Sequence, residues 1–481
     1  MSQRSAKKLT MAIAGISAAA LVLTACGGGS TTPAASDTAG AGSTTTSGGS
    51  ATTSGSSTDG GTVGATSTWC EDVKSKYGDL TGKKVSVYTT IVAPEDQPYI
   101  DAYKLFTECT GAEVSYEGSK EFEAQIVVRV QSGNPPDIGI FPQPGLISQL
   151  VNDTGKVIPL DPDVETFARK YFPEDWMNYG VINDIPFGIP NNADFKSLVW
   201  YNTKLYKDNG YSIPTTWEEL TALQDKVAAT TPPWCIGIKS GEATGWQITD
   251  WLEEYVLRDW GPDVYDQWVK HEIPFNDPKI ASSLAEVGKV LKDPKYVNAG
   301  FGGVDTIAST EFNDPSAKIQ DGQCTLSRQA ANFDANFKNV KLGPDGDVNA
   351  FYFPPKTTDF GNTVLGGGTF YAQFANAASG RPEVDAMMYF LASPEFANAR
   401  AKAGSWISAN RGLQASNVPS PIQQTALETL QKPDTTFRFD ASDLMPAPVG
   451  SDAEWKQFTA WVTGQDDQTT LNNIEAAWPA S

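Results

Sequence analysis

VINDIPFGIPNNADFKSLVWYNTKLYKDNGYSIPTTWEEL, residues 181–220, is the stretch on which the fold depends. The passage from Ile185 to Asn192 is rich in Pro, Gly and Asn, residues that mark turns. The apolar run from Ser197 to Tyr201 predicts a buried strand. Thr215 or Thr216 then predicts a helix cap, because glutamates follow at the spacing of a capping box. The chain therefore leaves one compact unit, crosses over as a strand and begins another.

Three motifs in this stretch carry a family resemblance. They are Gly188-Ile189-Pro190, the strand that ends in Tyr201-Asn202, and the helix start from Thr216 to Leu220. In this order they resemble the interdomain crossover of extracellular solute-binding proteins of bacterial sugar ABC importers. The resemblance implies an α/β fold of the type II periplasmic-binding-protein kind, with two lobes and three hinge crossings.

Two later motifs resemble the second and third crossings of that family. Gly366-Gly367-Gly368-Thr369-Phe370 resembles the second, and the helix at 382–403 with the following GSWISANRG resembles the third. Gly367 and Gly368 are expected to allow close backbone approach to a ligand, or a hinge bend. The domain boundaries that follow are a first lobe of residues 69–195 plus 363–408 and a second lobe of residues 196–362 plus 409–481.

Strands and helices alternate in the first lobe. We expect strands at 85–88, 114–116 and 136–141. Helices are expected at 94–108 and after Ser119, which should cap the second helix. Such alternation predicts a mostly parallel sheet that helices cover on both faces. In the second lobe we expect strands at 235–238 and 324–326.

The N-terminus carries an export signal. Residues 1–25 combine a basic start with an apolar core that is shorter than a membrane span. Leu23-Thr24-Ala25-Cys26 resembles a bacterial lipobox, which implies cleavage before Cys26 and lipidation of its thiol; an ordinary signal peptide with a chance Cys is the alternative. Residues 26–68, almost all Gly, Ser, Thr and Ala, then predict a flexible tether to the outer face of the bacterial cell membrane.

The composition is acidic. The formal net charge of −21 at pH 7 argues against a nucleic-acid partner and against adhesion to anionic lipid. Simple solubility is the plainer explanation of this charge. The length beyond residue 68 is sufficient for two or three domains, and we expect a monomer.

Four cysteines follow the tether, and four cysteines allow three pairings. We expect Cys70–Cys109 and Cys235–Cys324. The helix that returns antiparallel to the first strand should bring Cys109 back towards the start of that strand, near Cys70. Each bridge would stabilise the fold by about 3–4 kcal/mol. Metal binding by these thiols is disfavoured, because the chain has no CxxC motif and only one histidine, His271.

No catalytic signature is evident in the sequence. One histidine leaves no obvious Ser-His-Asp set, and there is no GxxxxGK[ST] motif for ATP hydrolysis. A carboxylate pair for glycoside hydrolysis stays open as an alternative, because acidic residues are too numerous for any pair to be informative. We expect no cofactor and no metal.

Aromatic residues give the stronger signal for a ligand. The chain has 13 Trp and 16 Tyr, and sugars stack their apolar faces on such rings while their hydroxyls bond carboxylates, amides and Arg. Trp246, with Asp250, lies near the top of a predicted strand-to-helix loop, where open α/β sheets bind ligands. Trp406 lies at the third crossing and should face the cleft. Core packing is the alternative for each Trp.

Other candidate contacts come from the resemblance or from position alone. By resemblance to the family, Trp455 stacks on sugar, and Asp194 and Lys196 lie where the family supplies a carboxylate contact. Three further residues open the second helix, whose amide end favours hydroxyl or anion contacts, and two more follow strands. These five are Ser119, Lys120, Glu121, Gln143 and Arg328. An ordinary surface loop explains such positions equally well.

The resemblance implies a function of capture. CIGI, GWQITDW and CTLSRQA, with their paired cysteines, resemble the α-glucoside-binding branch of the family. A sugar would bind between open lobes, the lobes would close about the hinge, and the closed form would dock on the membrane permease of an ABC importer. Two alternatives remain: a secreted carbohydrate-active enzyme, and a solute-binding protein for a non-sugar ligand such as a peptide or polyamine.

Overall fold

The computed structural model describes residues 68–479, with the exception of 299, 431 and 433. The predicted signal peptide, Cys26 and all but the last residue of the predicted tether lie outside this part of the chain. Among the described residues, no helix combines the length and the apolarity that a membrane crossing requires.

A five-stranded sheet forms the first part of the fold. Its strand order is β2-β1-β3-β12-β6, in which β1 lies parallel to β2 and β3, and β12 lies antiparallel to β3 and β6. The first three strands confirm the parallel sheet that the sequence predicts. The strands are β1 (Lys84–Thr89), β2 (Glu113–Gly118), β3 (Ile138–Phe141), β6 (Gly188–Pro190) and β12 (Phe370–Gln373).

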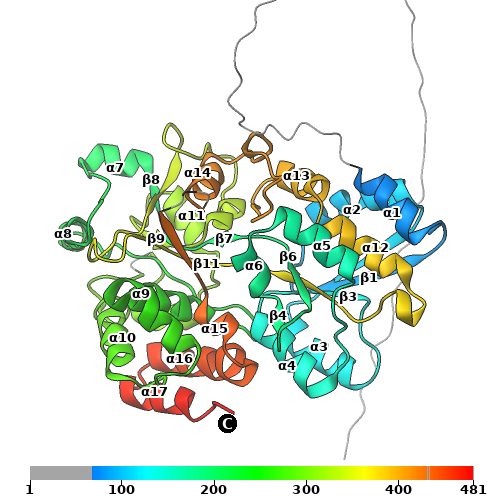
Figure 1. The fold of residues 1–481 in the computed structure, drawn as a ribbon. Coiled ribbons are helices and arrows are strands. Elements are labelled where there is room, and N and C mark those ends of the chain that lie inside the picture. The colour runs from blue at the N-terminus through cyan, green and yellow to red at the C-terminus, as the bar shows by residue number, and fades with distance from the viewer. Residues whose placement is uncertain (1–67, 299, 431, 433, 480–481) are drawn as a thin grey trace, which may run out of the picture. The chain divides into compact units, whose positions relative to one another are not determined.

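Helices lie on both faces of this sheet, with α2 and α12 on one side and α3 and α4 on the other (Figure 1). A two-stranded antiparallel hairpin, β4 (Val181–Ile182) with β5 (Ile185–Pro186), precedes β6 in the chain. The helices of this part are α1 (Trp69–Tyr77), α2 (Gln97–Thr110), α3 (Phe122–Gln131), α4 (Pro144–Thr154), α5 (Pro162–Tyr171), α6 (Glu174–Asn178), α12 (Pro382–Leu391) and α13 (Pro394–Lys402).

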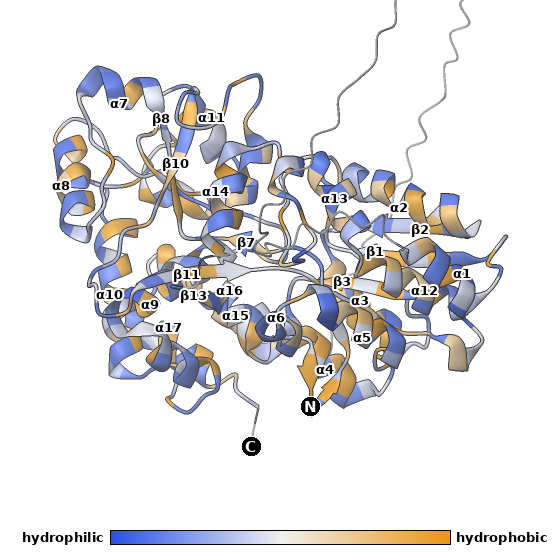
Figure 2. Ribbon diagram, turned by 45° about the horizontal axis from the view of Figure 1, so that its top comes forward, coloured by the Kyte–Doolittle hydropathy of each residue, from blue (hydrophilic) through white to orange (hydrophobic). Residues whose placement is uncertain are grey.

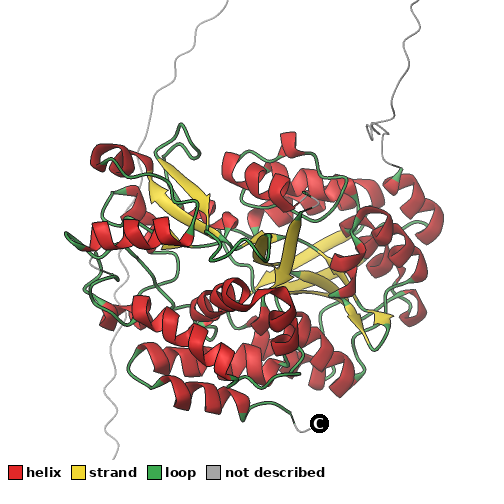
Figure 3. Cartoon of the chain, turned by 60° about the vertical axis from the view of Figure 1, so that its left-hand side comes forward, coloured by secondary structure: helices red, strands yellow, loops and turns green. Residues whose placement is uncertain are grey.

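Two small sheets belong to the rest of the fold (Figure 3). One has the order β10-β8-β9 and is antiparallel throughout. The other has the order β13-β11-β7, in which β11 lies parallel to β13 and antiparallel to β7. Their strands are β7 (Asp194–Phe195), β8 (Leu198–Asn202), β9 (Ser327–Arg328), β10 (Val348–Tyr352), β11 (Asn362–Gly367) and β13 (Thr435–Phe439).

The helices of this second part begin with the predicted cap. Thr216 caps α8, and its capping-box partner is Glu219, as the sequence predicts. The α-helices are α7 (Thr203–Asn209), α8 (Trp217–Ala228), α9 (Trp246–Val269), α10 (Pro278–Leu291), α11 (Pro315–Gln320), α14 (Pro421–Leu430), α15 (Ala441–Leu444), α16 (Glu454–Val462) and α17 (Asp467–Glu475). Short helical turns are η1 (Val304–Ser309), η2 (Ala331–Asn336), η3 (Ala377–Ser379), η4 (Ala415–Asn417) and η5 (Val449–Ala453).

Helix α9 is buried on all sides over its first turns, from Gln247 to Arg258. A helix in such a place is normally apolar all round. This one instead carries Asp250, Glu253, Glu254 and Arg258, which are 1 % exposed or less. Because a buried charge is costly without a partner, the sequence of α9 requires oppositely charged or hydrogen-bonding groups from other elements.

Buried apolar side chains form two clusters. The first surrounds the five-stranded sheet and includes Phe106, Ile140 and Phe390. The second packs α9 against α10 and α16 and includes Trp251 and Trp461. Apolar residues are dense along α12 and α4, which flank the sheet of the first cluster (Figure 2).

Three chain segments pass side by side between the sheets. The Asn191 N–H donates to the Thr369 carbonyl oxygen at 2.8 Å, and the Ala193 N–H donates to the Ile407 carbonyl oxygen at 2.9 Å. A Cβ on Gly368 would lie 2.3 Å from a carbonyl oxygen of the first segment, so only glycine permits this approach. These passages agree with the three predicted crossings.

Three local predictions are wrong. Ser119 does not cap α3: its N–H continues the sheet contact to the Thr89 carbonyl, and the helix begins only at Phe122. Residues 235–238 form no strand, because the Asn298 side chain and loop carbonyls bond their backbone in place of a neighbouring strand. The strand expected at 324–326 begins later, as β9, where pairing with β8 starts.

Both predicted disulfides are present. Cys70 on α1 bonds Cys109 near the end of α2, and Cys235 bonds Cys324, with a Cα–Cα distance of 5.9 Å in each. The second bridge joins two segments that also meet through the Cys235 N–H and the Leu326 carbonyl. The cysteine pairing expected from the sequence is confirmed.

Candidate functional site

A cavity of about 260 Å³ lies next to the three crossing segments. We call it the Trp246 chamber. Thr90 and Gln143 line it from the ends of β1 and β3, which are the carboxyl ends of parallel strands, where open α/β sheets bind ligands. From the other part of the fold it receives Trp246, the η2 region and the α15 turn.

A second cavity of about 290 Å³ adjoins the first, because Glu95, Asp194, Asn332 and Thr369 line both. Trp406 lines this second space, which we call the Trp406 chamber. The two chambers together are the cleft. Side chains from both parts of the fold and from the crossing segments therefore surround one continuous site.

Trp246 is the large half-buried ring of the cleft. It is the first residue of α9, and its ring centroid lies 5.4 Å from that of Phe312 and 5.5 Å from the Lys196 Nζ atom. Trp455, which also lines the Trp246 chamber, is 5 % exposed. Aromatic faces combined with polar groups are the usual lining of a site for a sugar-sized ligand.

Trp406 is held more firmly than Trp246. It is 3 % exposed, and its Nε1–H donates to the Tyr99 hydroxyl at 3.1 Å. The Arg400 guanidinium carbon lies 4.4 Å from the Tyr99 ring centroid and 5.7 Å from that of Trp406. This set of rings forms a wall of the Trp406 chamber.

Lys196 lies at the back of the Trp246 chamber. Its Nζ donates to Asp250 at 2.9 Å and also to Asp440. Although burial opposes its charge, these carboxylates hold the pKa of Lys196 well above the ordinary value. Burial raises the pKa of Asp440, but Lys196 outweighs that effect and the pKa is lowered. Lys196 is therefore charged and already bound to two acids.

A buried network continues behind Lys196. The Arg328 guanidinium donates to Asp250 at 3.3 Å and to Glu254 at 2.7 Å, and Glu254 also pairs with Arg258. Burial raises the pKa of Asp250 to about 6, and its two basic neighbours offset part of this shift. The buried charged residues Asp250, Glu254 and Arg258 of α9 therefore each have an oppositely charged partner.

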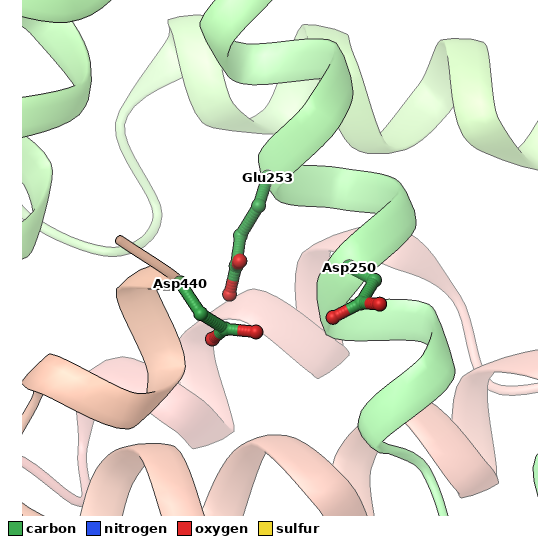
Figure 4. Close-up of side chains that lie close together, drawn as sticks. All are labelled: Asp250, Glu253 and Asp440. Atoms are coloured by element: carbon green, nitrogen blue, oxygen red, sulfur yellow. The ribbon is translucent and has the colours of Figure 1, made fainter. Parts of the chain in front are cut away.

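Three carboxylates of this network lie close together: Asp250 and Glu253 on α9, and Asp440 before α15 (Figure 4). Burial, and then Asp440, raises the pKa of Glu253 well above its ordinary value. Glu253 also accepts a hydrogen bond from the Ser442 N–H at 3.0 Å. Because the Lys196 ammonium bonds two of the three acids, a side chain supplies the cation of this cluster.

Four other carboxyl groups line the cleft, and burial raises the pKa of each. The pKa of Glu123 rises to about 7, and that of Asp443 rises further through burial and the nearby Asp440. Burial also raises the pKa values of Asp194 and Glu95; Lys196 offsets part of the shift of Asp194, and Asp194 adds to the shift of Glu95. Within the described residues, no ion pair joins any of these four to a basic side chain.

The predicted site residues fall into two groups. Seven of them line the cleft: Gln143, Asp194, Lys196, Trp246, Gly368, Trp406 and Trp455. The other six lie outside both linings: Ser119, Lys120, Glu121, Asp250, Arg328 and Gly367. Asp250 and Arg328 face each other in the buried network, and Glu121 is hydrogen-bonded to Glu242.

Several cleft residues escaped the sequence analysis. Glu95 and Glu123 come from the loop after β1 and from α3, and no local pattern marks them. Asp440 and Asp443 had a usable signal, since two Asp three residues apart at a strand-to-helix turn suggest a cap that presents carboxylates. Asn332 comes from η2, a turn that has no predicted counterpart.

A larger cavity of about 560 Å³ lies away from the cleft, among β8, β10, β11 and α14. Its floor is apolar, with Phe195, Leu198 and Val364, and Glu428 is its acidic residue. No Trp lines it in the described part of the chain. The cleft, with rings and converging polar groups, is the better candidate for a polar solute.

Comparison with known proteins shows the family of this chain. Residues 89–397 match the family model described as bacterial extracellular solute-binding protein. The chain belongs to this family. A relative from Synechocystis sp., named osmoprotective compounds-binding protein GgtB, is 35% identical over 409 residues, covering 84% of this chain and 94% of that protein. The alpha-glucosides-binding periplasmic protein AglE of Rhizobium meliloti is 34% identical over 424 residues, covering 85% and 90%.

Solved structures of solute-binding proteins share the fold of this family member. The bacterial solute receptor AcbH matches with a TM-score of 0.69 at 17% identity, over 82% of this chain and 97% of that one. A chitin oligosaccharide binding protein matches with a TM-score of 0.68 at 18% identity, over 82% and 97%. The type II, two-lobed α/β class expected from the sequence is confirmed.

Proposed function

We propose that this solute-binding protein captures a sugar, an α-glucoside or another oligosaccharide, and delivers it to the membrane permease of an ABC importer. The supporting observation is the cleft beside the crossing segments, where Trp246 and Trp455 meet carboxyl and amide groups. Rings offer faces for the C–H side of a sugar, and the polar groups match its hydroxyls. The name of AglE, an alpha-glucosides-binding protein, points to the same class of solute.

Capture would proceed by closure of two lobes, with the boundaries 69–195 plus 363–408 and 196–362 plus 409–481. Asp194, Gln143 and Glu95 would approach the sugar from one side, and Trp246 and Phe312 from the other. A ligand that contacts both sides shifts the population towards the closed form. The closed monomer would then dock on the permease.

A binding function is favoured over an enzymatic one. GgtB and AglE are both named as binding proteins. The raised pKa values in the cleft fit carboxyl groups that donate and accept hydrogen bonds to hydroxyls. A secreted carbohydrate-active enzyme would instead release products from an oligosaccharide incubated with the pure protein. A peptide or polyamine ligand would appear in a binding screen that includes those solutes.

The protein would be held at the cell surface by a lipid on Cys26, with residues 26–68 as tether. Cys26→Ala should therefore move the protein from the membrane fraction to the soluble fraction, because the lipid supplies the anchor. A cleaved variant that still sediments with membranes would contradict the anchor.

The test of the binding function is isothermal titration calorimetry of the protein from residue 69 onwards with trehalose, maltose and sucrose. At least one should bind, and it should raise the melting temperature by mass action. Absence of binding to these and to longer α-glucosides, together with binding of a peptide or polyamine, would overturn the assignment to sugar.

A further inference from the structure

The cleft carries an excess of acidic groups. Five carboxyl side chains line its two chambers: Glu95, Glu123, Asp194, Asp440 and Asp443. Among the described residues, the basic side chains that line it are Lys196 and Arg400. The cleft therefore presents many groups that can hold negative charge and few that can neutralise it.

Lys196 is paired with acids of the protein, whereas Arg400 is only partly bonded, because its buried Nε has no hydrogen-bond partner within the described part of the chain. Lys196 bonds Asp250 and Asp440, and Asp250 lies behind the cleft. Arg400 donates to the Gly404 carbonyl oxygen at 3.1 Å, and the rings of Tyr99 and Trp406 flank its guanidinium. An incoming anion would have to compete with two carboxylates for Lys196, and among the described residues Arg400 is the one basic side chain of the cleft that no acid pairs.

Four of the five acidic side chains, all except Asp440, form no ion pair with a basic side chain among the described residues, although Lys196 offsets part of the pKa shift of Asp194 and Asp443. Asp194 accepts from the Asn192 amide at 2.8 Å, which is a neutral donor. Burial raises the pKa of Glu123 to about 7 and also raises that of Asp443, to which the nearby Asp440 adds. A carboxyl group that holds its proton can donate to a hydroxyl, and one that loses it attracts a cation.

We propose that the cleft selects its solute by charge: it accepts a neutral glycoside or one that carries an ammonium group, and it rejects a glycoside that carries phosphate or carboxylate. This selectivity rests on the proposed sugar-binding function. Neutral hydroxyls can pair with both protonated and ionised carboxyls. An ammonium group adds the positive charge that the lining lacks, whereas an anion meets like charges in a partly desolvated site.

Calorimetry with a matched series of ligands tests the proposal. The tightest binder among trehalose, maltose and sucrose is compared with its 6-amino-6-deoxy, 6-phosphate and 6-O-acetyl derivatives. We expect the phosphate to bind about 100-fold more weakly than the parent, because juxtaposed like charges cost several kcal/mol, and the amine to bind at least as tightly as the acetyl derivative. The neutral acetyl group controls for size at the same carbon.

The weaker binding of the phosphate derivative should depend on the acidic residues of the cleft and not on the net charge of the protein. Glu95→Gln with Glu123→Gln should reduce the discrimination against phosphate by about tenfold. Glu108→Gln with Glu113→Gln removes the same charge from exposed positions outside the cleft and should leave the discrimination unchanged. Measurements at 0.15 M and 0.5 M salt should agree closely, because salt screens charges in a buried site much less than exposed charges.

Each contrary outcome overturns a definite part of the proposal. If the phosphate binds within threefold of the parent sugar, charge selection is wrong although the sugar-binding function stands. If acetyl and phosphate derivatives lose affinity equally, size rather than charge sets the preference. If no neutral glucoside binds but another class of solute does, the proposed function fails and charge selection among glycosides fails with it.

Discussion

Two neighbouring layers of acidic residues in this protein are built differently. In the layer behind Lys196, Asp250 and Glu254 each meet a basic side chain, so their charges are paired and buried. In the layer that lines the cleft, Asp194 and Glu123 have neutral partners and raised pKa values. Paired charges hold elements together, whereas charges without ionic partners remain available to a ligand.

The largest expected effect tests the paired layer. Arg328→Met should lower the free energy of unfolding by about 3–5 kcal/mol, because it leaves the Asp250 and Glu254 carboxylates buried without that partner. Chemical denaturation of the ligand-free protein measures this loss. Arg129→Met breaks the exposed pair with Glu117 and should cost less than about 1 kcal/mol. Equal costs for both variants would show that the buried network is not structural.

The next effect concerns the cleft layer. Trp246→Ala should weaken binding of the tightest glucoside by about 2 kcal/mol, or roughly thirtyfold, because a stacking ring is lost from a partly desolvated site. The ligand-free melting temperature should stay near that of the parent. Trp260→Ala is the matched control, since Trp260 lies on the same helix and outside the cleft. Loss of affinity in both variants would mean that α9 has been perturbed as a whole.

The third prediction concerns Asp385, an acidic residue that belongs to neither layer. Asp385 on α12 is 1 % exposed, and burial raises its pKa to about 6. Its folded-state pKa lies above the unfolded value, so the folded protein binds the extra proton and stability should fall as pH rises from about 4 to 6. Asp385→Asn removes this slope, and its stability relative to the parent should improve by roughly 1–2 kcal/mol over that window. Denaturant unfolding at several pH values measures the difference, and parallel pH profiles would contradict the assignment.

The comparison of the two layers also separates what the sequence could predict from what it could not. Thr216 and its glutamate form a local signal, and the structure bears out that cap. The expected cysteine pairs follow from the direction of one helix, and the expected crossings follow from the resemblance of short motifs, in a fixed order, to a known family. Such features depend on a few neighbouring residues or on topology.

The ion network depends instead on residues far apart in the chain. Asp250 and Arg328, which are both predicted ligand contacts, are hydrogen-bonded to each other although they lie 78 residues apart in the chain. The charged residues of α9 would indicate buried ionic partners only if the burial of that helix were already known, and the sequence does not show it. Similarly, the Asn298 side chain bonds the backbone of Ile236 where a neighbouring strand would otherwise pair. No local pattern in the sequence indicates this contact.

The most direct measurement is a crystal structure of the protein with its tightest neutral glucoside. We predict that the sugar lies in the cleft, with one ring on the face of Trp246 and its hydroxyls on Asp194 and Gln143. The larger cavity among β8, β10, β11 and α14 is the competing place. A sugar found there, or a cleft without sugar in crystals that bind it, would contradict the proposed capture site.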